Sequence, residues 1–250
     1  MNSKNRLTVG IIGIPIQLER KHNKSTESFA PGLTDHLRSK TKEFIERKSK
    51  EVKIKADVQD LGELFDNNDN LSSDGELTGI SKSCLDRLAE ELKRKMKGIN
   101  FLIVFGGIHT GAYLLYHLPG EVERFDLHED DNDINIPFHT SYMKYATILK
   151  NPSQIFNHDW TDILETRLED EPVGKLFDID IDYYVSTEYC KFKKADEKQN
   201  FNRIISAIQK TKPRVIGLFE FQKLDKTEYK KMLEIVWNGI KVTDIFDEVI

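Results

Sequence analysis

Short apolar runs rich in β-branched residues recur along the chain, each bounded by charged or turn-forming residues, and they predict buried strands. Continuous apolar character, as opposed to strict alternation with polar residues, is typical of strands that are covered on both faces of a parallel sheet. The predicted strands are Leu7–Ile14, Val52–Val58, Phe101–Phe105, Val122–Phe125, Lys175–Ile181 and Val215–Phe219.

Between these runs, apolar residues recur at steps of three and four, which predicts amphipathic helices. The first such helix is expected to begin at Ser81 or Ser83 and to end at Gly98. Alternating strands and helices predict an α/β fold with three layers (α/β/α) and a mostly parallel central sheet. No shift in composition marks a second unit, so residues 1–250 are expected to form one domain. The apolar stripes are Leu85, Leu88, Leu92 and Met96; Phe201, Ile204, Ile205 and Ile208; and Tyr229, Met232, Leu233 and Val236.

Composition and charge narrow the class of protein. The chain has 250 residues, of which 38% are hydrophobic, enough for one sizeable core. A formal net charge of -5 gives no basic field for phosphates, so nucleic acid is not an expected partner. No stretch approaches the ~20 apolar residues of a membrane span, and no signal peptide is recognisable. Cys84 and Cys190 form no closely spaced pair. A cytoplasmic protein with no membrane partner is expected.

Acidic and imidazole side chains follow three of the predicted strands. Alternate positions on an extended backbone project to one side, so each group can present its side chains together. In parallel strands these ends lie at one edge of the sheet, where ligands of α/β proteins bind. The residues are His109 after the third run, Asp126, His128 and Asp130 after the fourth, and Asp178, Asp180 and Asp182 within and after the fifth.

Several carboxylates gathered in one place, with no arginine or lysine expected among them, would repel one another strongly. Divalent cations relieve this repulsion, and mixed carboxylate and imidazole ligands suit Mn²⁺, Fe²⁺ or Zn²⁺ better than Ca²⁺ or Mg²⁺. Six ligands could hold two ions ~4 Å apart if carboxylates bridge them. The spacing alone leaves open a simpler alternative, in which each aspartate caps a turn and each histidine is an ordinary core or surface residue.

Three motifs resemble those of the ureohydrolase family of arginases, agmatinases and formiminoglutamases. They read GGIHT at Gly106–Thr110, DLHEDDN at Asp126–Asn132 and FDID at Phe177–Asp180. The opening VGIIGIP at Val9–Pro15 is similar to the family's first strand, and LFEFQ at Leu218–Gln222 resembles a late segment of the family. The resemblance implies an arginase-like fold and a hydrolase that cleaves a C–N bond of a guanidino or amidino compound.

The resemblance also implies a role for each residue of the motifs. Two divalent metal ions, with manganese expected, would hold a bridging hydroxide that attacks the substrate carbon. The expected partners are a small guanidino or amidino substrate or an arginine-containing peptide, and further copies of the chain in a trimer or hexamer. The implied ligands of one ion are His109, Asp126, Asp130 and Asp178, and those of the other are Asp126, His128, Asp178 and Asp180. The other implied roles are proton transfer for Asp130, proton shuttling for His139, pairing with the guanidinium for Glu220, and contact with the distal end of the substrate for Asn132.

The chain departs from the family's pattern in ways that leave alternatives open. Ile108 stands where the family has an acidic residue, and Ile136–Phe138 replaces a glycine-rich approach to His139. DIDIDYY at Asp178–Tyr184 is similar to the DIDLDYF signature of a divergent arginase-like group that includes peptide arginases. That likeness leaves open a second register, in which Asp180 and Asp182 are the ligands. Two other functions stay open: a metal-dependent amide deacetylase, and a catalytically silent arginase-like protein with a role in assembly or regulation.

Overall fold

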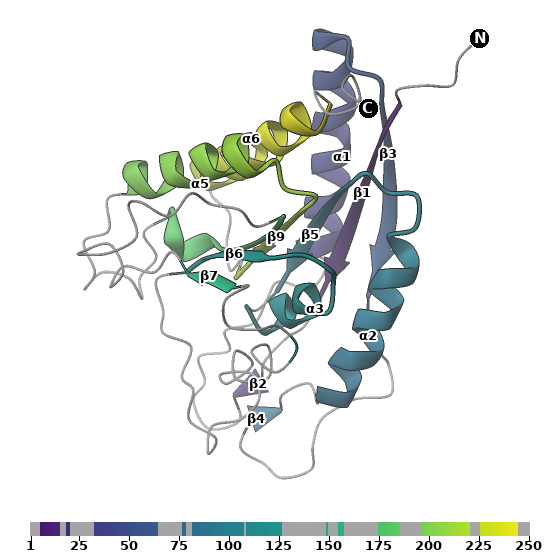
Figure 1. The fold of residues 1–250 in the computed structure, drawn as a ribbon, viewed down its shortest axis with the longest axis vertical. Helices are drawn as coiled ribbons and strands as arrows, with labels where there is room; N and C mark the ends of the chain where they lie inside the picture. The colour runs from purple at the N-terminus through teal and green to yellow at the C-terminus, as the bar shows by residue number, and fades with distance from the viewer. Residues whose placement is uncertain are drawn as a thin grey trace.

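The central sheet is the main feature of the chain. The computed structural model describes residues 6–15, 19–20, 33–64, 77–78, 82–107, 109–126, 149, 155–157, 175–185, 197–220 and 226–244. Within these ranges, seven strands form one sheet in the order β3-β1-β5-β9-β8-β6-β7, and every neighbouring pair is parallel (Figure 1). The strands are β1 (Leu7–Ile14), β3 (Ala56–Glu63), β5 (Phe101–Gly106), β6 (Val122–Phe125), β7 (Ile155–Asn157), β8 (Leu176–Asp180) and β9 (Val215–Phe219), and β2 (Glu19–Arg20) with β4 (Leu77–Thr78) forms a separate antiparallel pair.

Helices cover both faces of this sheet, which gives the three predicted layers. On one face α1 (Leu33–Val52), α5 (Glu197–Thr211) and α6 (Lys226–Asp244) pack into one hydrophobic cluster, and on the other α2 (Lys82–Lys95) and α3 (Tyr113–Tyr116) pack into a second. Two 3-10 turns, η1 (His109–Ala112) and η3 (Ile181–Tyr183), follow β5 and β8. None of the helices in the described ranges is both long and apolar enough to cross a membrane.

The strand side chains alternate between the two clusters, as the pleat of a strand requires. In β5, Phe101, Ile103 and Phe105 belong to the cluster under α1 and α6, whereas Leu102 and Val104 belong to the cluster under α2 and α3. Because both faces are buried, the strand reads as one continuous apolar run. This is why the central strands were recognisable in the sequence.

The predicted strand boundaries are confirmed for β1, β6 and β9. β5 differs from its prediction by one residue at its carboxyl end, and β8 differs by one residue at each end. The prediction for Val52–Val58 is wrong in its first half. Val52 is the last residue of α1 and is 51% exposed, and Lys53 follows with a φ of 62°, a left-handed conformation that ends the helix. The exposed valine extended the apolar run in the sequence, whereas the strand runs from Ala56 to Glu63.

The three predicted helical stripes are confirmed as α2, α5 and α6, except that Met96, the last residue of the first stripe, lies one residue past the end of α2. Gly98 has a φ of 81° and follows the end of α2, as expected of a residue that closes a helix. Three short strands, β2, β4 and β7, were not predicted, because two or three residues carry too little periodicity to be recognised.

The strand order creates the place where a ligand would bind. β5 and β6 follow one another in the chain, but β9 and β8 lie between them in the sheet. The carboxyl ends of β5, β9, β8 and β6 therefore lie side by side at the point where the strand order reverses. Such a crevice is the usual ligand site of an open α/β sheet.

Candidate metal centre

Each of these four neighbouring strands delivers a candidate functional residue at its carboxyl end. His109 begins η1, shortly after β5, and Glu220 directly follows β9. Asp180 is the last residue of β8, and Asp126 directly follows β6. Residues that are far apart in the sequence thus meet at one edge of the sheet.

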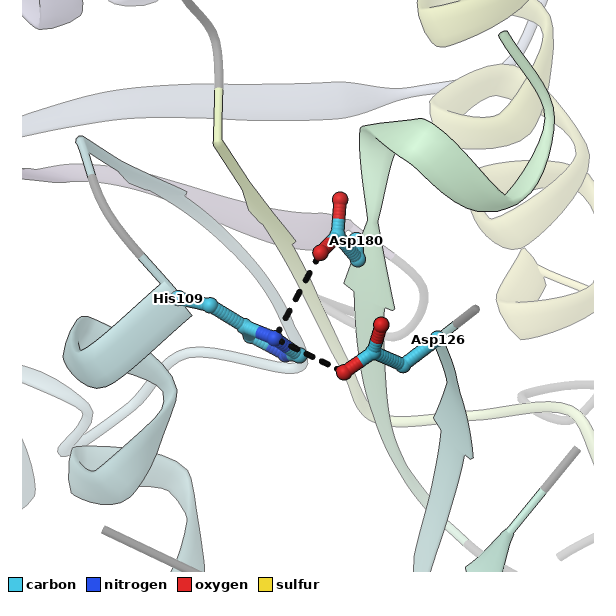
Figure 2. Close-up of side chains that lie close together, drawn as sticks. All are labelled: His109, Asp126 and Asp180. Carbon is cyan, nitrogen blue, oxygen red and sulfur yellow. Dashed lines mark ion pairs between the residues drawn. The ribbon is translucent and has the colours of Figure 1, made fainter. Parts of the chain in front are cut away.

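Three of these side chains point toward a common centre (Figure 2). His109, Asp126 and Asp180 each offer a ligand atom, and these atoms all lie within 4.8 Å of one another. His109 Nδ1 is 3.1 Å from Asp126 Oδ2 and 3.6 Å from Asp180 Oδ2. All three residues are buried, with exposed fractions of 4%, 1% and 1%. Two carboxylates and one imidazole nitrogen at this spacing are a donor set suited to Mn²⁺, Fe²⁺ or Zn²⁺.

The strand register explains why Asp126 and Asp180 meet. β6 and β8 pair with Arg124 opposite Asp178 and Phe125 opposite Ile179, so the next step along both strands brings Asp126 level with Asp180. Asp178 lies two residues further back in β8, where it is paired with Gly217 of β9. Asp178 and Asp180 therefore share a face of the sheet but lie at different depths.

Asp178 contacts the other side of the His109 ring. Its Oδ1 is 2.9 Å from His109 Nε2, and its Oδ2 accepts a hydrogen bond of 2.9 Å from the Tyr116 hydroxyl. Asp178 is fully buried. The imidazole is thus held between Asp178 on its Nε2 side and the pair Asp126 and Asp180 on its Nδ1 side.

The electrostatic field of this site favours positive charge. Burial alone would lower the pKa of His109, but the negative charges of Asp178 and Asp126, and hydrogen bonds to both, outweigh it and raise that pKa well above its usual value. A divalent cation would be stabilised by the same carboxylates.

Arg124 also reaches this site, and the expectation of an acidic cluster without arginine or lysine is wrong on this point. The Arg124 guanidinium donates a hydrogen bond to Asp126 Oδ2, and the Arg124 side chain is 5% exposed. Arg124 and Asp126 are two positions apart on extended backbone, so their side chains project to the same side. The Arg124 guanidinium pairs with only one of the three carboxylates of Asp126, Asp178 and Asp180, so the donor set still fits a metal ion.

Several predicted site residues lie outside the part of the chain that the structure describes. Their roles stay predictions from the motif. They are His128, Asp130, Asn132 and His139, together with the side chain of Asp182.

Three residues that contact the predicted site were missed from the sequence. Tyr116 follows His109 by about two helical turns. That spacing returns a side chain to the same side of a helix, so it could have indicated that Tyr116 reaches the site. Arg124 was signalled by its place two residues before Asp126. Phe219, whose ring centroid is 5.9 Å from that of His109, carries no signal in sequence because it looks like any core residue.

Close packing between β5 and β9 fixes the ring of Phe219 beside His109. A Cβ added to Gly106 would lie 2.1 Å from Phe219 Cδ1, so only glycine fits at the end of β5. We expect Gly106→Ala to lower the free energy of unfolding by about 1–3 kcal/mol, because Phe219 must move. Metal affinity should fall with it, since His109 loses the ring against which it packs. Urea unfolding and metal titration measure the two effects.

Gly111 provides the matched control for this substitution. An added Cβ there would meet its nearest atoms at 3.4 Å, which is ordinary contact. Gly111→Ala should therefore change the free energy of unfolding by less than about 1 kcal/mol. Equal stability of the two variants would contradict the packing argument.

Comparison with known proteins bears on the fold. No protein-family model matches the chain, and no curated protein matches it. Among solved structures, the agmatine ureohydrolase of Thermoplasma volcanium superposes with a TM-score of 0.63 at 15% identity, covering 100% of this chain and 94% of that chain. An arginase from Bacillus subtilis gives 0.56 at 16% identity, covering 93% and 98%. The proclavaminate amidino hydrolase of Streptomyces clavuligerus gives 0.52 at 14% identity, covering 97% and 94%.

These matches confirm the ureohydrolase resemblance at the level of the fold. In the part that the structure describes, the chain has the arginase-like α/β fold. Its buried group of one histidine and two aspartates lies at the carboxyl edge of that fold.

Proposed function

We propose that this protein is a metal-dependent hydrolase that cleaves a C–N bond of a guanidino or amidino compound. It holds two divalent metal ions, and manganese is the metal that we expect. The observation that carries the proposal is the convergence of His109, Asp126 and Asp180 at the carboxyl edge of an arginase-like sheet. The solved structures that share the fold are named as a ureohydrolase, an arginase and an amidino hydrolase, which supports this class of reaction.

The metal site would be built from both described and predicted ligands. Of the six predicted ligands, His109, Asp126, Asp178 and Asp180 lie together in the described part of the chain. His128 and Asp130, from the segment after β6, would complete the set. Two bound ions would supply an activated water molecule for attack on the trigonal carbon.

The remaining steps would fall to side chains around the metals. Asp130 would accept the proton of the attacking water and pass it to the leaving amine, and His139 would carry a further proton between the site and solvent. Glu220 would pair with the substrate guanidinium, a geometry suited to two parallel hydrogen bonds. Asn132 would contact the distal end of the substrate.

The backbone at Glu220 supports a special role for that residue. Its φ is 65°, a left-handed conformation that costs a non-glycine residue about 1–2 kcal/mol. Two other described non-glycine residues have positive φ, Lys53 and Lys212, and both follow the end of a helix, where this conformation is usual. Glu220 instead directly follows the buried strand β9 beside the candidate site, where strain is typical of functional residues.

Glu220→Gly is expected to raise the free energy of unfolding by about 0.5–1 kcal/mol, because glycine adopts this φ without strain. The same substitution should strongly reduce turnover, since the carboxylate that would hold the guanidinium is lost. Lys53→Gly is the matched control, with a similar gain in stability and unchanged turnover. A Glu220→Gly variant with full activity would contradict the role of Glu220.

The experiment that tests the proposed function combines metal analysis with an activity panel. The purified protein is loaded with Mn²⁺, and the release of urea or ammonia is followed from agmatine, arginine, a formimino compound and a peptide with internal arginine. The proposal predicts bound metal and release from at least one substrate. Metal-free protein after loading would refute the proposal. Bound metal without release from any substrate would favour the silent assembly role, and hydrolysis of an acetylated amine would favour the deacetylase.

A cytoplasmic location and a homo-oligomer, a trimer or hexamer, belong to the same proposal. Both come from the sequence and from the ureohydrolase resemblance. Light scattering of the purified protein would measure the assembly directly.

A further inference from the structure

The carboxylate of Asp178 is engaged on both of its oxygens. Oδ1 lies 2.9 Å from His109 Nε2, and Oδ2 accepts the Tyr116 hydroxyl at 2.9 Å. Asp178 has no exposed surface, and Tyr116 is 1% exposed. Asp178 is therefore fixed between a histidine ring and a tyrosine hydroxyl, in a place that water does not reach.

The two nitrogens of an imidazole point in different directions, and their roles at a metal site differ. One nitrogen binds the metal through its lone pair, while the other carries the proton and donates it to a carboxylate or carbonyl that fixes the ring. In this chain Nδ1 of His109 faces Asp126 and Asp180 (Figure 2), and Nε2 lies 2.9 Å from Asp178 Oδ1. An ion shared by Nδ1, Asp126 and Asp180 would have the ring between itself and Asp178.

The depth of each aspartate in the sheet agrees with a metal ion on the Nδ1 side of His109 and Asp178 on the Nε2 side. Asp180 is the last residue of β8 and, by the register, is level with Asp126. Asp178 is paired with Arg124 on one side and Gly217 on the other, one full pleat inside the sheet. Residues at the edge of the sheet can share an ion, whereas Asp178 lies behind the ring that would bind it.

We propose that Asp178 is a positioning residue, which orients His109 for metal binding and is itself held by Tyr116. This inference rests on the proposed metal site and changes the role of one member of its predicted ligand set. This role is compatible with the second register that the sequence left open, in which Asp180 and Asp182 are the ligands.

Titration of purified protein with Mn²⁺ by calorimetry separates a ligand from a positioning residue. We expect Asp180→Asn to abolish binding of at least one ion. Asp178→Asn should keep the wild-type stoichiometry and weaken binding about 10–100-fold, because the amide oxygen can still accept the Nε2 proton less strongly. Loss of metal from Asp178→Asn as complete as from Asp180→Asn would overturn the inference.

Tyr116→Phe and Tyr113→Phe form a matched pair that tests whether the Tyr116 hydroxyl holds Asp178 in place. Both tyrosines lie in α3 and are buried, but the Tyr113 hydroxyl donates to Asp86, on α2, at 3.1 Å. Tyr116→Phe should weaken Mn²⁺ binding by up to about ten-fold, and Tyr113→Phe should leave it unchanged. Equal effects of the two variants on Mn²⁺ affinity would overturn the role of Tyr116.

Nitrogen-15 NMR of the wild-type protein identifies the nitrogen of His109 that binds the metal without any substitution. With diamagnetic Zn²⁺ bound, His109 should carry its proton on Nε2 and bind the ion through Nδ1. Coordination through Nε2 would overturn the inference while leaving the proposed function intact. Wild-type protein that binds neither Mn²⁺ nor Zn²⁺ would overturn the proposed function, and this inference with it.

Discussion

Asp126→Ala is expected to abolish metal binding and to lower the free energy of unfolding of the metal-free protein by about 3 kcal/mol. Metal is lost because Asp126 offers one of the three converging ligand atoms. Stability is lost because Asp126 accepts a hydrogen bond from the buried Arg124 and lies 3.1 Å from His109 Nδ1. Removal of one partner of a buried charge pair leaves the other partly uncompensated in a site that excludes water. Elemental analysis and urea unfolding in the presence of a chelator measure the two losses separately.

Asp57→Ala is the matched control, since it removes an exposed ion pair. Arg6 and Asp57 lie 3.0 Å apart, but their side chains are 67% and 37% exposed. Such a pair contributes less than about 1 kcal/mol, and metal content should not change. An Asp126→Ala variant that keeps its metal, or whose urea unfolding midpoint equals that of Asp57→Ala, would contradict the account of the site.

Arg124→Met should change metal affinity in the opposite direction. The Arg124 guanidinium occupies an oxygen of Asp126 that an ion would need, and its positive charge opposes that ion in a buried site. We expect at least about ten-fold tighter Mn²⁺ binding in the variant, because like charges a few ångströms apart repel by more than 1 kcal/mol even at an effective dielectric constant of 20. The metal-free variant should be less stable, since the carboxylates lose a compensating charge. Calorimetric titration and urea unfolding measure both changes.

Arg124→Lys provides the control because it keeps the positive charge. Its Mn²⁺ affinity should stay within a few-fold of the wild type. Weaker binding in Arg124→Met would show instead that Arg124 is needed to hold Asp126 in place for the metal.

The fold could be predicted where strands are buried on both faces. β5 and β9 read as continuous apolar runs, whereas β6 and β8 combine apolar residues with charged ones. The polar residues at the carboxyl ends of these strands indicated the site, because parallel strands end at one edge of the sheet. The edge strand β3 has exposed and half-buried positions along its length, so its start was misplaced.

The arrangement within the site could be predicted only in part. Alternation along a strand shows that Asp178 and Asp180 share a face, but not that they meet opposite nitrogens of His109. That outcome depends on η1, a short turn that sets the direction of the imidazole and has no periodic signature. The same alternation predicts that Arg124 and Asp126 lie on one side of the strand. That the Arg124 guanidinium enters the candidate metal site becomes apparent only when the neighbouring strands are in place.

A crystal structure of the protein grown with Mn²⁺, with anomalous scattering recorded, tests the central claim most directly. The account predicts an anomalous peak at about 2.0–2.2 Å from His109 Nδ1 and from a carboxylate oxygen of Asp126 or Asp180. It also predicts a second peak ~4 Å away and the guanidinium of Arg124 displaced from Asp126 Oδ2. A map with no anomalous peak at this edge of the sheet, and with Arg124 still bonded to Asp126, would contradict it.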